Sequence, residues 1–224
     1  MTPQFQFEVD PYAIAEQQVG PCLAAFDIET YSAELPAEAQ DPAVVIGVGH
    51  TTGLGVASKV YLRCFASSSP ALEDEAGLVE QFLAHIDLLP GGTLCAHWGF
   101  GETLEDGFDA PYLRRRCREH HPALPGRLEA SLARWRQHDT CRRSVAPDHV
   151  SRSLYALEDY HGLFRPAHLR VPGDQVQYLV RAFWEQKDPT LVQYNMADVY
   201  NCLRLAQNQL RKHINPLVNI MGQN

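Results

Sequence analysis

The sequence predicts an α/β fold built as one domain, and three observations support this. Apolar, strand-like runs come first, at residues 22–28, 43–51 and 56–65, and segments with helical spacing follow later. A short apolar run at 93–99 lies between two helical segments, an alternation typical of α/β domains. The length of 224 residues, with 45% hydrophobic and 21% charged side chains, suits one well-cored soluble domain.

The elements can be placed in order along the chain. Each apolar run ends in residues rich in proline, glycine or polar side chains, which mark loops and turns. The predicted strands are residues 22–28, 43–51, 56–65 and 93–99, and helices are predicted within 67–92, 108–121, 151–163, 173–186 and 190–212. The domain is expected to span residues 21–212, between an N-terminal arm at 1–20 and a C-terminal tail at 213–224.

Targeting and compartment signals point to the cytoplasm. The first twenty residues lack the basic start and apolar centre of a signal peptide, and no stretch approaches 18 uncharged apolar residues. We therefore expect no membrane association. The six cysteines include no C-x-x-C pair, which favours reduced thiols over a disulfide framework or a zinc site.

The charge is distributed unevenly along the chain. The net charge is −8, but residues 114–143 carry nine arginines against three acids, whereas residues 1–113 carry two basic and 17 acidic side chains. Arginine suits bidentate contacts with phosphate, so Arg114, Arg115 and Arg116 are the candidate nucleic-acid contacts. The alternative is a solvated helix face whose arginines pair with neighbouring acids.

Two carboxylates stand at the end of the first predicted strand, in the sequence FDIET. Asp27 and Glu29 project on the same face, because residues i and i+2 of a strand do so. Adjacent carboxylates on a buried strand repel each other and lose hydration. A shared proton, an arginine partner or a divalent cation would relieve this, and a solvated strand end is the alternative interpretation.

The last predicted helix carries a third acid on an apolar face. One stripe at i+3/i+4 spacing holds Leu191, Tyr194, Asp198, Cys202 and Leu205, and an apolar seam runs beside it. The same grid assigns Asn195, Asn201, Arg204 and Asn208 to the solvent side. Asp198, with Tyr194 one turn before it, therefore needs a partner. A metal shared with Asp27 and Glu29 would provide one, and pairing with an arginine is the alternative.

A fourth acid lies midway between these motifs. Asp109 follows Phe108 at the start of a predicted helix and is a candidate N-cap, a role that suits Pro111 in the first turn. A cap and a metal ligand are compatible roles for one carboxylate. In the acidic stretch before it, Asp106 and Glu105 are alternative ligands.

Taken in order, FDIET, FDAPYLRRR and YNMAD resemble motifs I, II and III of the DEDD superfamily of 3′–5′ exonucleases. The Tyr-x-x-x-Asp form of the third motif resembles the DEDDy branch, which includes ribonuclease D and the proofreading domains of family B DNA polymerases. Residues 138–176 also resemble the helical stretch of stand-alone bacterial relatives. The resemblance covers about residues 20–210, and it implies a ribonuclease H-like mixed central sheet flanked by helices.

The resemblance implies a two-metal phosphodiesterase. It assigns two Mg²⁺ or Mn²⁺ ions to Asp27, Glu29, Asp109 and Asp198, and it gives Tyr194 the role of orienting the attacking water. The expected substrate is a single-stranded or frayed 3′ end, with DNA preferred. An exoribonuclease and an inactive nucleic-acid-binding module are the alternatives, and a protein partner is left open.

Overall fold

The computed structural model describes residues 22–31, 40–51 and 58–214. The predicted arm at 1–20 lies outside these residues, as does nearly all of the predicted tail. None of the helices in the described part of the chain combines the length and the apolar character that a membrane crossing requires.

Within the described residues, five strands form one mixed sheet in the order β3-β2-β1-β4-β5. The strands are β1 (Cys22–Thr30), β2 (Ala43–Thr51), β3 (Tyr61–Ala66), β4 (Gly92–Ala96) and β5 (Trp135–Asp139). β2 runs antiparallel to β1 and to β3, whereas β4 is parallel to β1 and to β5. This order and these directions are those of a ribonuclease H-like α/β fold, which confirms the predicted fold class.

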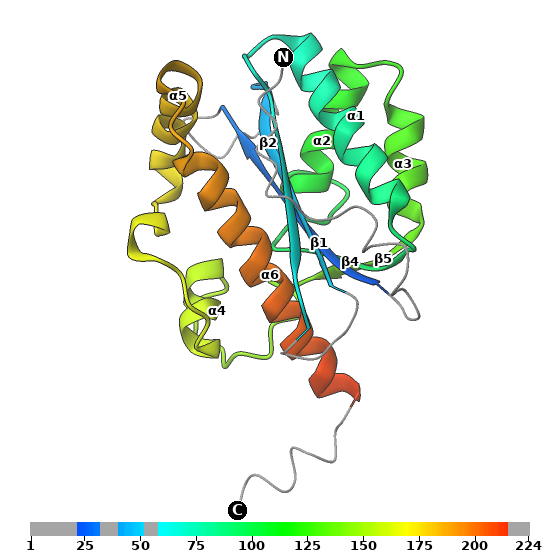
Figure 1. The fold of residues 1–224 in the computed structure, drawn as a ribbon. Coiled ribbons are helices and arrows are strands. Elements are labelled where there is room, and N and C mark those ends of the chain that lie inside the picture. The colour runs from blue at the N-terminus through cyan, green and yellow to red at the C-terminus, as the bar shows by residue number, and fades with distance from the viewer. Residues whose placement is uncertain (1–21, 32–39, 52–57, 215–224) are drawn as a thin grey trace, which may run out of the picture.

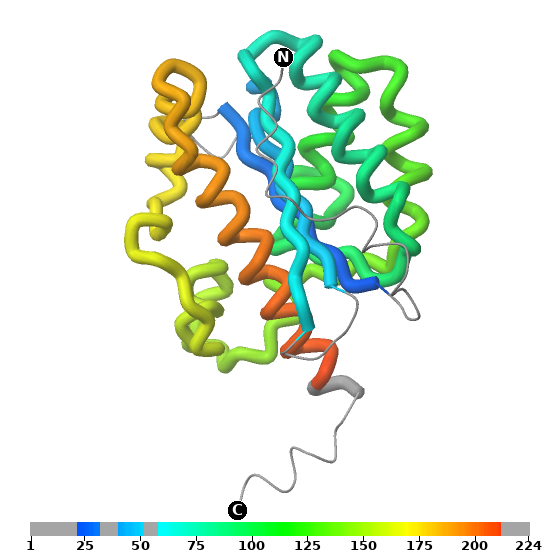
Figure 2. The backbone as a smooth tube through the Cα atoms, viewed as in Figure 1, coloured from blue at the N-terminus to red at the C-terminus, as the bar shows by residue number. Residues whose placement is uncertain are grey.

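Helices cover both faces of this sheet (Figure 1). They are α1 (Leu72–Leu88), α2 (Asp109–His120), α3 (Pro125–Ala133), α4 (Leu154–His161), α5 (Val176–Gln186) and α6 (Thr190–Ile214). α1, α2 and α3 form one layer, and α4, α5 and α6 lie on the other side. Figure 2 shows the long α6 running beside the strands over most of its length.

Two elements were not predicted. α3 and β5 lie inside the arginine-rich stretch, where charge obscures the pattern. In β5, with the sequence WRQHD, Trp135 and His138 are buried while Arg136 and Gln137 are exposed, so the strand lacks regular alternation. As the outer neighbour of β4, it is recognisable only through its parallel pairing.

Candidate metal centre

The central strand divides its side chains between the two helical layers. Phe26 enters the apolar cluster that packs against α1 and α2, whereas Leu23 and Ala25 enter the cluster that packs against α6. Because side chains alternate along a strand, Asp27 and Glu29 continue the row on the α6 face. The acid pair is therefore the end of an otherwise apolar row.

The acid pair lies where the parallel part of the sheet ends. The pairing of β1 with β4 stops at Ala25, two residues before Asp27. Open α/β sheets commonly bind ligands beyond the carboxyl ends of their parallel strands. α6 brings Asp198 to this place, and ligand oxygens of Asp27, Glu29 and Asp198 all lie within 4.8 Å of one another. Carboxylate oxygens at this spacing could hold a divalent cation.

Asp109 approaches the same strand from the opposite layer. It is buried, and its carboxylate accepts a hydrogen bond from the backbone N–H of Ile28, which lies between the two acids of β1. Its Oδ2 is buried and has no hydrogen-bond partner among the described residues. A Cβ added at Gly99 would lie 2.4 Å from that oxygen. The Asp109 carboxylate fits here because residue 99 is a glycine.

The predicted cap at Asp109 is wrong. Phe108 occupies the N-cap position of α2, and Asp109 is the first helical residue, with its carboxylate directed to β1. The alternative acids lie elsewhere: Glu105 and Asp106 are exposed, and Asp106 accepts a hydrogen bond from Thr103 at 3.2 Å. Among the three carboxylates, Asp109 is the one placed beside β1.

Burial and mutual repulsion dominate the electrostatics of the four acids. Burial raises the pKa of Asp27, Glu29 and Asp109 well above the usual range, and nearby carboxylates raise it further. Burial also raises the pKa of Asp198 to about 6, although the Arg165 guanidinium partly opposes that shift. Protonation or a bound cation would relieve the repulsion among these carboxylates.

Asn195 holds the acid pair in place, and its predicted position on the solvent side is wrong. It is fully buried, and its Nδ2 donates to Asp27 Oδ2 at 2.8 Å and to Glu29 Oε1 at 3.3 Å. A Cβ at Gly47, the β2 partner of Asp27, would lie 2.0 Å from Asn195 Oδ1. Gly47, the first glycine in VIGVGH, is the sequence signal that allows this polar side chain to lie against the sheet.

Asn201, also predicted to face solvent, is buried and belongs to a second network beside the cluster. Its Nδ2 donates to Glu158 Oε1 at 2.8 Å. Glu158 accepts hydrogen bonds from Nε and Nη2 of Arg165, and the same guanidinium donates to Asp198. The arginine partner considered for Asp198 is thus present, and the carboxylate also lies in the acid cluster. Glu158 and Arg165 both lie in the sequence LEDYHGLFR, on either side of Gly162, which ends α4.

Tyr194 lies one helical turn before Asp198, as the spacing predicts. Its hydroxyl lies within hydrogen-bonding reach of Asp198 and of the Tyr155 hydroxyl, which itself donates to Val171 O at 2.9 Å. Burial and the neighbouring carboxylates raise the pKa of Tyr194 above its ordinary value. The phenol is therefore held as a hydrogen-bond donor beside the carboxylates.

The structure contradicts the prediction that Arg116 contacts nucleic acid. Only 1% of the residue is exposed, and its Nη2 pairs with Glu75 Oε2 at 2.6 Å. Its Nη1 donates to Gln40 O at 2.8 Å. A side chain this deeply engaged has no surface for a phosphate, so Arg116 is a buried structural residue.

The other two arginines of the cluster reach the surface but have acidic partners. Arg114 pairs with Glu129 at 2.8 Å and also donates to Gly101 O at 3.1 Å. Arg115 pairs with Glu119 one turn later, at 2.9 Å. The pairing considered as the alternative is therefore present, and a role of Arg114 and Arg115 in substrate binding stays a prediction.

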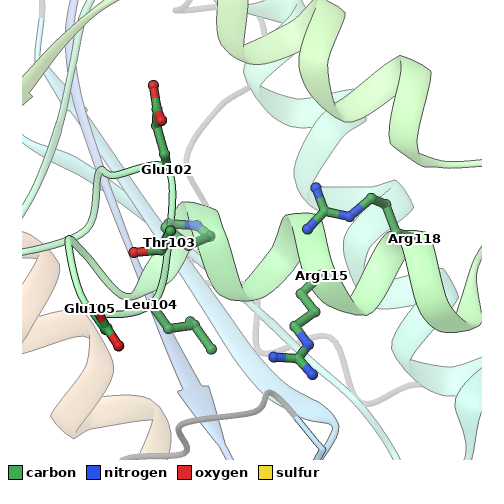
Figure 3. A pocket seen from close by; sticks show the side chains of 7 residues that line it. Glu102, Thr103, Leu104, Glu105, Arg115 and Arg118 are labelled. Atoms are coloured by element: carbon green, nitrogen blue, oxygen red, sulfur yellow. The ribbon is translucent and has the colours of Figure 1, made fainter.

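A pocket of about 340 Å³ lies between α2 and the loop before it (Figure 3). Its lining residues are Glu102, Thr103, Leu104, Glu105, Pro111, Arg115 and Arg118. Asp27, Glu29, Asp109 and Asp198 are not among these lining residues. Its lining combines two acids of the loop with two arginines of α2, and it is separate from the candidate metal centre.

No protein-family model and no curated protein matches the sequence. Solved structures of exonuclease I are similar to the chain at low identity. An "ExoI/SSB-Ct complex" matches at 13% identity and a TM-score of 0.46, covering 88% of this chain and 42% of that one. A zinc-bound E. coli ExoI–ssDNA complex matches at 14% identity and 0.38, covering 91% and 43%. The chain thus spans about two-fifths of the length of these proteins.

Proposed function

We propose that this chain is a divalent-metal-dependent 3′–5′ exonuclease acting on single-stranded or frayed nucleic-acid ends, with DNA as its preferred substrate. One observation carries the proposal. Asp27 and Glu29 from the central strand meet Asp198 from α6, with ligand oxygens within 4.8 Å of one another. The direction of digestion and the preference for free ends come from the resemblance of the three motifs to the DEDDy exonucleases.

The donor set fits Mg²⁺ or Mn²⁺. It consists of carboxylate oxygens, which these hard cations prefer, whereas zinc prefers nitrogen and sulfur. Asp109 adds a buried oxygen that no described residue engages. Asp27, Glu29 and Asp198 would hold one ion, and Asp109 with Asp27 would hold a second. When bound, such ions lower the pKa of a water molecule and neutralise charge on the oxygens of a phosphodiester.

The side chains around the acids have distinct tasks in this proposal. Asn195 fixes the orientation of Asp27 and Glu29 through its Nδ2. Tyr194 offers a hydroxyl at the edge of the cluster, next to Asp198, where it can orient an attacking water. Packing under α6 excludes bulk water from the row that ends in the acids, which strengthens the electrostatic interactions within the site.

An exoribonuclease is the second candidate, because the three motifs do not distinguish ribose from deoxyribose. An inactive binding module is the candidate of another class. It would require neither the complete set of four acids nor the tyrosine one turn before Asp198.

The test is digestion of matched DNA and RNA oligonucleotides carrying a label at the 5′ end. A ladder that shortens from the 3′ end with Mg²⁺ or Mn²⁺, and disappears in EDTA, is expected, with DNA digested faster. Cleavage that persists in EDTA would contradict the metal-dependent mechanism. Binding without cleavage under every metal condition would support the inactive module.

A further inference from the structure

Arg165 is a fully buried cation placed at the margin of the acid cluster. Its side chain is 0% exposed, as is that of Glu158, its main partner. Nε and Nη2 of Arg165 donate to Glu158 at 3.0 and 2.6 Å, which is the bidentate arrangement that guanidinium and carboxylate favour. Nη2 also donates to Asp198 Oδ1. One guanidinium therefore connects a dedicated acid to a proposed metal ligand.

Contacts on every side fix this guanidinium. Nη1 donates to Leu169 O at 3.3 Å, and Asn201 Nδ2 donates to Glu158 Oε1 at 2.8 Å from α6. The planes of two tyrosines flank the group, with the centre of the guanidinium 4.8 Å from the Tyr155 ring centroid and 5.8 Å from that of Tyr194. The hydrogen bond to Asp198 therefore comes from a donor that has little freedom to move.

The charges explain why two residues are needed. A lone buried arginine beside the acids would neutralise Asp198 and compete with a metal cation. Glu158 balances the charge of Arg165, so the pair as a whole is neutral and Asp198 still contributes its charge to the cluster. A carboxylate has two oxygens, and the contact with Arg165 is made through Oδ1. The carboxylate is oriented while it keeps its capacity to bind a cation.

We propose that Glu158 and Arg165 form a positioning unit that orients Asp198 for metal binding. The inference rests on the proposed function, since it assigns a partner to one of the proposed ligands. Residues that hydrogen-bond to metal ligands orient them, and their loss typically lowers metal affinity or activity by about 10–100-fold. Neither residue touches substrate in this account, and both act through Asp198.

The structure supplies a matched control on the other side of the sheet. Arg116 and Glu75 form an equally buried pair, with side chains 2% and 0% exposed and a shortest N–O distance of 2.6 Å. Glu75 also contacts His121 at 2.8 Å. Among the described residues, no hydrogen bond or ion pair joins Glu75 or Arg116 to Asp27, Glu29, Asp109 or Asp198. Changes to this pair should affect folding without affecting the metal centre.

The test compares Arg165→Lys and Glu158→Gln with Arg116→Lys and Glu75→Gln. Mn²⁺ affinity is measured from the electron paramagnetic resonance signal of free Mn²⁺, at a temperature where each variant is folded by circular dichroism. We expect the first two variants to bind Mn²⁺ about 10–100-fold more weakly than wild type, and the two controls to bind it equally well. Arg165→Lys keeps the charge, so a loss of Mn²⁺ affinity in this variant is due to the lost hydrogen-bond geometry of the guanidinium. Glu158→Gln keeps the size of the side chain and carries the test if the lysine variant does not fold.

The outcomes separate this inference from the proposed function. Wild-type Mn²⁺ affinity in folded Arg165→Lys or Glu158→Gln would overturn the inference and leave the exonuclease standing. Selective loss of affinity in these variants, together with a wild type that cleaves no nucleic acid, would support the positioning unit and contradict the exonuclease. A wild type that binds no Mn²⁺ would overturn both.

Discussion

The two helical layers each contain a buried arginine–glutamate pair, and the two pairs differ in what else they contact. On one side, Glu75 receives Arg116, His121 and the backbone N–H of Ala43, and none of these partners belongs to the acid cluster. On the other side, the Arg165–Glu158 pair extends to Asp198. A buried arginine–glutamate pair therefore supports packing in one layer, whereas in the other layer such a pair adjoins carboxylates whose charge the protein does not balance.

The difference lies in how the acids are compensated. Glu75 has its own arginine, and its pKa is lowered because hydrogen bonds from Arg116, Ala43 and His121 outweigh burial. Asp27 and Glu29 have Asn195 as a neutral partner, and burial raises the pKa of both. Charge left uncompensated by protein is the physical sign of a ligand site, because a fully structural network would be satisfied internally.

The largest expected effect is on turnover. Asp27→Asn keeps the shape of the side chain and an oxygen that can accept from Asn195, but it removes a charge from the centre of the cluster. We expect cleavage to fall by roughly 10³-fold or more, since the bound metal would supply both the nucleophile and charge neutralisation. Initial rates on a labelled single-stranded oligonucleotide measure this. A rate within a few-fold of wild type would remove Asp27 from the mechanism.

Tyr194→Phe tests the comparison of the two helical layers by removing one hydroxyl from the layer formed by α4, α5 and α6. If that hydroxyl orients the water, the rate should fall by roughly 10²–10⁴-fold or less, the range of a positioned acid–base group. Stabilisation by Mn²⁺ should survive, because the tyrosine is not a proposed ligand. The control is Tyr112→Phe, which removes a buried hydroxyl bonded to Asp41 O in the other layer. Equal rates for both variants would make Tyr194 a packing residue.

Breaking the self-contained pair should destabilise the fold without changing the chemistry. Glu75→Ala leaves Arg116 buried without its carboxylate, which should lower the free energy of unfolding by about 3–5 kcal/mol. Urea denaturation measures the loss, and the rate per folded molecule should equal that of wild type. A specific loss of activity in folded Glu75→Ala would show that the two layers are coupled.

Gly47→Ala tests whether α6 is held against the sheet as closely as the site requires. The added Cβ would meet Asn195 Oδ1 at 2.0 Å and Val199 Cγ2 at 2.9 Å. We expect a loss of stability of about 1–3 kcal/mol from overpacking, together with weaker Mn²⁺ binding as Asn195 moves. In Gly77→Ala on α1, the Cβ meets no described atom within 4 Å, so that variant should be stabilised by about 0.5–1 kcal/mol.

The pH dependence of the metal-free protein should show the smallest effect. Asp27, Glu29 and Asp109 have folded-state pKa values above those of the unfolded chain. The folded state then keeps protons that the unfolded state has released, so stability in EDTA is greatest below about pH 4 for this group of acids and falls as the pH rises. Asp27→Asn should flatten this fall and raise stability at pH 8 by about 0.5–2 kcal/mol.

Chemical denaturation at several pH values in EDTA measures that effect, and the same series with Mn²⁺ provides the control. Mn²⁺ should restore wild-type stability at pH 8 and leave Asp27→Asn unchanged. If the metal-free wild type instead gained stability across the same range through its acid cluster, the account of uncompensated carboxylates would be wrong.

The sequence predicted four of the five described strands and the acid-bearing elements, because their patterns are local. Period-two alternation placed Asp27 beside Glu29, and helical spacing placed Tyr194 one turn before Asp198. It could not predict the side on which Asn195 lies, because only the fit between α6 and Gly47 brings that face against β2. Buried asparagines look like solvent-facing ones on a helical grid.

The prediction that three adjacent arginines contact nucleic acid was incomplete for a similar reason. Arg114, Arg115 and Arg116 are adjacent in sequence, but a helix turns them about 100° apart. Arg116 therefore faces the core and Glu75, while its neighbours face surface acids. Arg165, outside the arginine-rich segment, lies beside the acid cluster, and only the tertiary fold brings it to Asp198.

The most direct test of the central claim is a count of bound Mn²⁺ at pH 8 by electron paramagnetic resonance, for wild type and Asp27→Asn side by side. We expect saturable binding by wild type, with the bound ions lost from the folded Asp27→Asn variant. Equal binding by both proteins, or none by the folded wild type, would contradict a metal centre built on Asp27, Glu29 and Asp198.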